Sequence, residues 1–315
     1  MSVDVAGLTG RLLDGDRRAL ARVLSWLEDG AEPLVRDVVA RLHRASGHAH
    51  LVGMTGSPGV GKSTLSSQLV TEWRARGRQV AVLAVDPSSP FSGGALLGDR
   101  VRMQEHALDP GVYVRSMASR GHLGGLAWAT PQALLALDAA GFDVVLLETV
   151  GVGQAEVEVA SVADTTVVTV APGMGDAVQA AKAGILEIAD LFCVNKADRD
   201  GADRTVRELS DMQRLLPGLP EIPIHRTVAA KGEGIVELAD AIGEHRDALH
   251  EDGRLTERRR SRARMQVREL ALGVVRERFA AAAGGTLFDE LIDRVERREV
   301  DPYTAADRLV EALEG

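Results

Sequence analysis

Cysteine is almost absent from this chain: Cys193 is the only one in 315 residues, so no internal disulfide can form. It lies in the apolar run 191–194, and we expect a buried thiol in a reducing compartment, with the cytoplasm as the default location. Long hydrophobic runs and a secretory signal pattern are also missing, so we expect no membrane span. Basic residues are outnumbered, and the formal net charge of -9 argues against general affinity for nucleic acids or anionic membranes.

Apolar residues are plentiful, at 45% of the chain, and their spacing divides the sequence into three parts. Residues 1–47 show helical spacing, which predicts an N-terminal helical extension. Residues 48–253 alternate short apolar runs with helical stretches. Runs that are apolar on both faces are typical of parallel strands covered by helices, so this part is predicted to be an α/β core with a mainly parallel, doubly wound sheet. The predicted strands are 51–54, 80–85, 144–147, 166–170, 191–194 and 222–224.

The third part, residues 254–315, is predicted to contain three helices with apolar stripes. The first starts near Thr256 and ends near Gly284, and Pro302 opens the last. Such stripes need a partner surface, so we favour an arm for self-association, with packing back onto the core as the alternative. Six arginines between 254 and 264 could indicate nucleic acid binding, but a solvated helix face fits the acidic chain better.

A glycine-rich loop lies between the first predicted strand and a predicted helix. It matches the phosphate-loop pattern in full, and this strand and helix are the context that the pattern requires. Glycines let backbone amides turn toward phosphates, and the N-terminus of the following helix adds positive potential. We expect Lys62 to reach the β- and γ-phosphates and the Ser63 hydroxyl to bind Mg²⁺. The nucleotide-binding residues predicted here are Gly56, Ser57, Pro58, Gly59, Val60, Gly61, Lys62, Ser63 and Thr64.

A second motif, Asn-Lys-Ala-Asp at residues 195–198, ends a late predicted strand of the same sheet. Asp198 can accept hydrogen bonds from the guanine ring N–H and exocyclic amine. Asn195 can meet the acceptor nitrogen of the five-membered ring, and the Lys196 stem can cover the base. A site built to hydrogen-bond particular groups rejects analogues that lack them by as much as ~10⁴–10⁵, so GTP is expected to bind in preference to ATP. The backbone segment predicted to complete this site is Val228, Ala229 and Ala230, with the Ala229 N–H facing the guanine oxygen.

Carboxylates follow two predicted strands at their carboxyl ends, the edge where open α/β sheets bind ligands. Asp86 and Glu148 hold these positions, and Asp99 lies in a glycine-rich loop. One or more of them would hold Mg²⁺ or its waters, because magnesium takes few direct carboxylates; a helix N-cap is the alternative for Asp86. The Gly151 amide can sense the γ-phosphate. Val152 follows it where many signalling GTPases have a water-orienting glutamine, so unaided hydrolysis should be slow.

Longer strings of the sequence resemble one family of P-loop NTPases. This family is the MeaB/ArgK group of GTPases, which accompany adenosylcobalamin-dependent acyl-CoA mutases and include the human methylmalonic aciduria type A protein. The resemblance runs from the N-terminal helices through the whole core, with weaker support in the C-terminal arm. The strings that carry it are VDPSS (85–89), LGDR (97–100), SMASRGHLGGLA (116–127), ETVGVGQAE (148–156) and GDAVQAAKAGILEIAD (175–190).

The resemblance implies functions for particular residues. It places Mg²⁺ chemistry around Ser63, Asp86, Asp99 and Glu148, and it implies mobile switch segments near 88–105, 149–156 and 172–186. Gln154 belongs to the second switch, whereas Gln179 and Lys182 belong to the third, and these side chains are candidates for coupling to a partner. Ala155, Ala177 and Val228 depart from the family pattern, which usually has serine at the first and third positions and often an acidic residue at the second.

The role implied by the resemblance is that of a mutase chaperone. GTP would gate the loading of adenosylcobalamin, and the protein would protect or reactivate methylmalonyl-CoA mutase or a close relative, without binding cobalamin directly. Because the family uses its C-terminal arm for dimerisation, a homodimer is expected. Two other functions stay open on the residues: a nickel metallochaperone GTPase, which would need clustered cysteine or histidine, and a small-molecule kinase, for which a guanine-selecting loop is unexpected.

Overall fold

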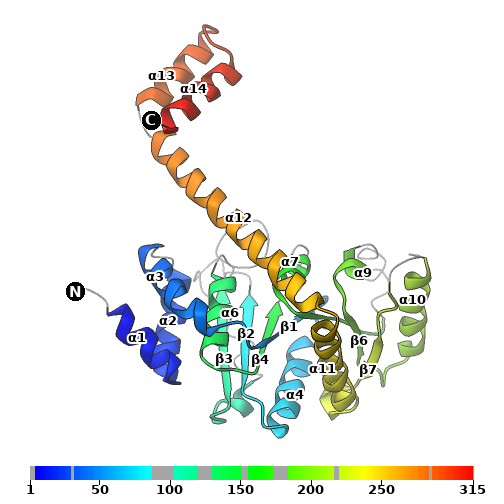
Figure 1. The fold of residues 1–315 in the computed structure, drawn as a ribbon. Helices are drawn as coiled ribbons and strands as arrows, with labels where there is room; N and C mark the ends of the chain where they lie inside the picture. The colour runs from blue at the N-terminus through cyan, green and yellow to red at the C-terminus, as the bar shows by residue number, and fades with distance from the viewer. Residues whose placement is uncertain are drawn as a thin grey trace. The chain divides into compact units, whose positions relative to one another are not determined.

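The computed structural model describes residues 4–29, 32–86, 103–118, 129–149, 155–173, 184–215, 220–283 and 286–314. The chain divides into two compact units, Met1–Leu255 and Thr256–Gly315. The first unit holds a parallel sheet with helices on both of its faces, and the second is helical (Figure 1).

Within the described residues, the sheet has seven strands in the order β3-β2-β4-β1-β5-β6-β7, and every pair of neighbours is parallel. Because all these pairs are parallel, the carboxyl ends of the strands meet at one edge of the sheet, and β1 lies at its centre. This arrangement confirms the predicted doubly wound α/β fold. The strands are β1 (His50–Thr55), β2 (Val80–Asp86), β3 (Val112–Ala118), β4 (Val144–Thr149), β5 (Thr165–Val170), β6 (Leu191–Asn195) and β7 (Ile224–Thr227).

Both edge strands differ from the sequence prediction. The strand β3 is missing from the prediction, because at the sheet edge its middle residues 113–116 are only half-buried and include Arg115 and Ser116. The strand β7 begins at Ile224, where the prediction ends it. The apolar signal there comes from Ile222, which is buried in a loop. The Gln213 side-chain amide accepts from the Ile222 N–H at 2.6 Å and donates to the Ile222 carbonyl at 3.1 Å.

Alternate residues of each strand face opposite helical layers. Val52 and Met54 of β1 pack with Leu65 of α4 and with α11, whereas Leu51 packs on the other side with α6, α7 and the N-terminal helices. The helices α9 and α10 extend that second layer over β5 and β6. The helices of these layers are α4 (Lys62–Ala75), α6 (Thr130–Ala139), α7 (Ala155–Val162), α9 (Gly184–Ile188), α10 (Ala202–Arg214) and α11 (Ile235–Glu251).

The N-terminal part is helical, as predicted. It contains α1 (Val5–Leu13), α2 (Arg17–Asp29) and α3 (Glu32–Leu42), followed by the short 3₁₀ helix η1 (His43–Ala45). Leu12, Leu20 and Leu24 are fully or almost fully buried, and these helices pack against α6, so their apolar faces belong to the core of the first unit.

The second unit consists of helices in the described residues: most of α12 (Arg254–Ala283), then α13 (Thr286–Glu296) and α14 (Pro302–Glu314). Leu291 of α13 packs with Ala305 and Leu309 of α14 in a small cluster of its own. Large apolar side chains along α12 stay exposed in the single chain, among them Val267 and Val275. No helix within the described residues is long and apolar enough to cross a membrane.

Candidate functional site

The phosphate-loop sequence joins the end of β1 to the start of α4. Gly61 precedes the first helical residue, Lys62, with a left-handed backbone (φ 96°), and a Cβ there would lie 2.5 Å from Nδ2 of Asn195. Gly56 has φ 140°, and a Cβ on it would lie 2.1 Å from the carbonyl oxygen of Thr169 on β5. Both positions therefore require glycine, for backbone conformation and for close approach to neighbouring strands.

Lys62 and Ser63 lie at the N-terminus of α4 with their side chains buried. The Lys62 ammonium donates to the carbonyl oxygens of Gly56 at 2.6 Å and Ser57 at 3.2 Å, so it lies within the curve of the loop. A phosphate bound in this loop would meet that ammonium and the positive end of the α4 helix dipole together.

A buried hydroxyl–carboxylate pair lies beside this helix N-terminus. Ser63 Oγ donates to Glu148 Oε1 at 2.7 Å, and Glu148 is 3% exposed. The pair forms because β4 lies next to β1, with Glu148 in register with Met54. Mg²⁺ binds hydroxyl and carboxylate oxygens of proteins. Waters and phosphate oxygens of the substrate usually fill its other coordination positions. The pair therefore fits a magnesium ion that is shared with a bound nucleotide.

Asn195, at the end of β6, links the phosphate loop to the loop after β7. Its Nδ2 donates to the carbonyl of Val60 at 2.9 Å, while its Oδ1 accepts from Thr227 Oγ1 and from the Ala229 N–H, each at 3.1 Å. The side chain is 2% exposed. Ala229 N–H, expected to face a guanine oxygen, thus already has an acceptor in Asn195, and a bound base would share that donor.

The next residues of the motif have their own contacts. Lys196 adopts a left-handed backbone (φ 58°), which is uncommon for a residue with a Cβ, and its ammonium donates to the Gly59 carbonyl at 2.5 Å. Asp198 forms an ion pair with Lys231, 3.1 Å between Oδ2 and Nζ. The Lys231 ammonium lowers the pKa of the Asp198 carboxyl, and Asp198 in turn raises the pKa of Lys231. The carboxylate that we expect to read guanine therefore stays ionised.

The structure thus brings the phosphate loop, Ser63, Glu148 and the 195–198 motif to one edge of the sheet. Thr64 and Pro58 are exposed, whereas Val228 is buried. Asp86 ends β2, but its side chain is outside the described part, and so are these other predicted site residues: Asp99, Gly151, Gln154, Gln179 and Lys182. The sequence prediction lacks Thr227 and Lys231, although both lie in the same segment as Ala229.

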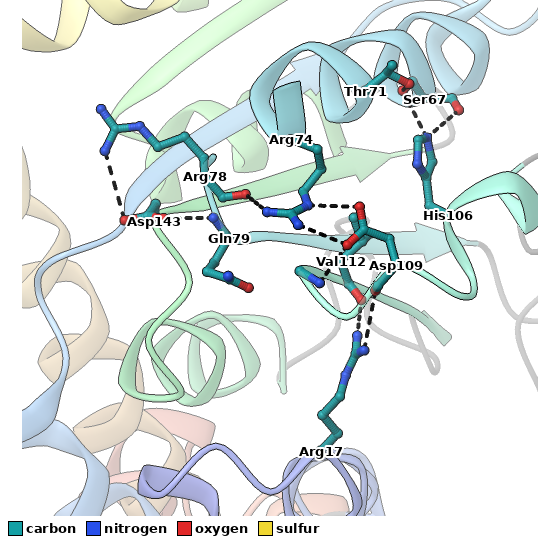
Figure 2. Close-up of polar contacts among 11 residues, drawn as sticks. Arg17, Ser67, Thr71, Arg74, Arg78, Gln79, His106, Asp109, Val112 and Asp143 are labelled. Carbon is teal, nitrogen blue, oxygen red and sulfur yellow. Dashed lines mark hydrogen bonds and ion pairs between the residues drawn. The ribbon is translucent and has the colours of Figure 1, made fainter. Parts of the chain in front are cut away.

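A second polar cluster lies at the amino ends of the strands, on the side of the sheet away from the phosphate loop, around the starts of β2 and β3 (Figure 2). The Arg74 guanidinium forms two hydrogen bonds of 2.9 Å with the Asp109 carboxylate, which lowers the pKa of Asp109. Arg17 of α2 donates to the carbonyls of Asp109 and Val112. A cavity of about 430 Å³ borders Arg17, His106 and Val114. Arg17 of α2 and Arg74 of α4 thus both donate to groups at or just before the start of β3. These hydrogen bonds anchor α2 and α4 to β3.

Several known proteins are similar to this chain. The family model described as methylmalonyl-CoA mutase-associated GTPase MeaB matches residues 20–284. A protein of Pyrococcus abyssi that is named as a GTPase is 48% identical over 315 residues, covering 98% of this chain and 96% of its own. The mitochondrial methylmalonic aciduria type A homolog of Mus musculus is 36% identical over 272 residues, covering 83% of this chain and 65% of its own. A crystal structure of an LAO/AO transport system kinase aligns over 100% of both chains, with 26% identity and a TM-score of 0.71.

Proposed function

Because the chain belongs to the MeaB family of methylmalonyl-CoA mutase-associated GTPases, we propose that it is a GTP-dependent chaperone of an adenosylcobalamin-dependent acyl-CoA mutase. The chain is a GTP hydrolase of that family, and relatives such as the Pyrococcus abyssi protein are named as GTPases. In the proposed role, GTP gates the loading of adenosylcobalamin and the protein protects or reactivates the mutase. The family description names methylmalonyl-CoA mutase, which supports that enzyme or a close relative as the partner.

In the proposed nucleotide site, different residues bind the phosphates, the metal ion and the base. Lys62 would stabilise the β- and γ-phosphates, and the backbone amides of the phosphate loop would orient them. Ser63 and Glu148 would hold the Mg²⁺ that neutralises charge developing on the transferred phosphoryl group, with Asp86 and Asp99 as further candidate ligands. Asp198 would accept the two guanine N–H donors. Positioning and electrostatics of this kind are the main protein contributions to phosphoryl transfer.

One observation carries the nucleotide part of the proposal: the buried Asn195 amide bonds both to the phosphate loop and to the loop after β7. A single side chain thereby fixes the distance between the expected phosphate end and the expected base end of a nucleotide. Such a fixed spacing suits a ligand with phosphates at one end and a base at the other, as in a nucleotide. The mutase part of the proposal rests on family membership.

The two other functions have less support. A nickel metallochaperone would need clustered metal-binding side chains, yet the described residues contain no group of three or more His, Cys, Asp or Glu that could hold a metal ion. Cys193 is fully buried on β6, where burial raises its pKa. One similar protein of known structure, at 26% identity, is called a transport system kinase, but the Asn195–Asp198 motif is unexpected in a small-molecule kinase.

The test is phosphate release from GTP with and without the purified cognate mutase. Val152 takes the place of a water-orienting glutamine, so we expect slow turnover alone and a marked rise when the mutase adds or orders a group at the γ-phosphate. Such groups are worth ~10³–10⁵ in rate in GTPases that use an arginine finger, which sets the upper end of the effect.

Two variants make the test specific. Lys182→Ala is expected to remove the mutase-dependent rise while GTP binding, measured by calorimetry, is retained. Arg207→Ala, which removes an exposed cation on α10, serves as the matched control and should keep the full rise. Equal rates with and without mutase, for methylmalonyl-CoA mutase and for related acyl-CoA mutases, would mean that the nucleotide cycle is not coupled to such a partner.

A further inference from the structure

The loop after β7 is closed on itself and presents Lys231. Val228 and Glu233 form an antiparallel bridge, with Val228 N–H donating to the Glu233 carbonyl at 3.0 Å. The Lys231 N–H donates to the Val228 carbonyl at 2.8 Å, which completes a 3₁₀ turn. Gly234 follows with φ 74°, and a Cβ there would lie 2.1 Å from the Arg226 carbonyl oxygen. The backbone of Lys231 is therefore fixed by bonds within its own loop.

The backbone that carries Asp198 is fixed in a similar way. Ala197 N–H donates to the Thr227 carbonyl at 3.0 Å, and Arg199 N–H donates to the Lys196 carbonyl at 3.0 Å. These bonds set the position of the Asp198 Cα relative to β7. The Asp198 side chain is 38% exposed, and its carboxylate also accepts a hydrogen bond from the Asp198 backbone N–H, a local contact that allows more than one direction of the carboxylate plane.

Lys231 reaches this carboxylate from the opposite loop, with Nζ 3.1 Å from Oδ2 and a side chain that is 55% exposed. A carboxylate has about four acceptor positions on its two oxygens, and an ammonium uses one of them. The ion pair can therefore persist while two other positions accept the guanine ring N–H and the exocyclic amine. Because the Lys231 ammonium binds one lone pair of Oδ2, it also favours one orientation of the carboxylate plane.

We propose that Lys231 is a specificity-determining residue of this GTPase, because it orients the Asp198 carboxylate for two-point recognition of guanine. The proposal rests on the guanine site proposed above and adds a residue to it. Lys231 acts through Asp198, so it is a positioning residue. Its removal lets the carboxylate rotate, so that it keeps the guanine ring N–H but misses the exocyclic amine.

Inosine diphosphate separates this role from general damage, because hypoxanthine keeps the ring N–H and lacks the exocyclic amine. Calorimetric Kd values for GDP and inosine diphosphate would be measured for the full chain and for Lys231→Met. An exposed ion pair contributes little, so we expect the preference for GDP over inosine diphosphate to fall by about two- to fivefold in Lys231→Met. Lys231→Arg keeps a cation in place and is expected to restore the preference.

Arg226→Met is the matched control. It removes another exposed ion pair of the same β7 segment, Arg226–Asp203 at 2.5 Å, and should leave the preference unchanged. A preference in Lys231→Met equal to that of the unmodified chain would overturn the proposal, and so would equal weakening of both nucleotides. Tighter GDP binding would also overturn it, because Lys231 would then compete with the base.

Failure of the guanine site itself has a different signature. Asp198→Ala should weaken GDP binding strongly; if it does not, Asp198 does not read the base and Lys231 has nothing to orient. No mutase is present in these measurements, so their outcome is independent of the proposed chaperone role.

Discussion

Asn195→Ala is the sharpest test of how the site is held together. The substitution removes a side chain that is 2% exposed and makes three hydrogen bonds, to Val60, Thr227 and Ala229. Each such bond contributes about 0.5–1.5 kcal/mol net, so the free energy of unfolding of the first unit should fall by about 3 kcal/mol. For a unit of this size the corresponding drop in Tm is about 6–12 °C.

Urea unfolding followed by circular dichroism would measure this loss, and calorimetry with GDP would measure binding at a temperature where the variant is folded. Thr227→Val is the matched variant, because it removes one of the three bonds and keeps the Asn195 amide. It also removes the contact of Thr227 Oγ1 with Cys193 Sγ, so it should cost about 1–2 kcal/mol. Loss of GDP affinity should follow the same order, since the phosphate loop and the loop after β7 are no longer tied together. If Asn195→Ala unfolds at the same urea concentration as the unmodified chain, the buried amide does not hold these loops.

Three further predictions concern other parts of the chain. Asp198→Asn should weaken GTP binding and favour xanthosine triphosphate; calorimetry that finds unchanged GTP affinity would remove Asp198 from the site. Ending the chain after Leu255, which is buried within the first unit, should give a monomer by light scattering that still binds GTP, and a truncated chain that remains dimeric would refute the proposed arm. Burial raises the pKa of Cys193 to about 12, so iodoacetamide at pH 8 should modify it only in urea; modification of the folded protein at the rate of a free thiol would contradict this.

The sequence predicted the central strands well because their burial on both faces makes them continuous apolar runs. β1, β4, β5 and β6 each have every residue buried, and their short length with polar or glycine-containing flanks favours strands over helices. β3 could not be predicted in this way, since an edge strand is paired on one side and its outward groups can be capped by distant side chains. Arg115 of β3 illustrates this: its half-buried guanidinium pairs with Glu28 of α2, 2.7 Å away, a contact that local spacing does not reveal.

Within the candidate site, motifs predicted which residues gather at the sheet edge but not how they contact one another. Asn195 is predicted to meet the base, and the structure adds a role that the motif did not indicate, a link between two loops. Lys231 was absent from the prediction because exposed lysines are common in loops, and only the fold places it beside Asp198. Its nearest sequence signal is the pair of glycines at 232 and 234, both with positive φ, which indicate a constrained turn.

The Asn195 link also limits which parts of the site can change conformation between the GTP and GDP states. One buried amide holds the Val60 carbonyl and the Ala229 N–H, so displacing either loop would break a bond and leave a buried polar group unsatisfied, at a cost of about 1–3 kcal/mol. The phosphate loop and the guanine loop are therefore expected to act as one rigid receptor for GTP and GDP alike. A response that distinguishes the two nucleotides has to arise from groups that contact the γ-phosphate or its metal. On the described contacts, Ser63 and Glu148 are the pair through which such a response would begin, since separating them shifts a carboxylate at the end of β4, one residue before Thr149.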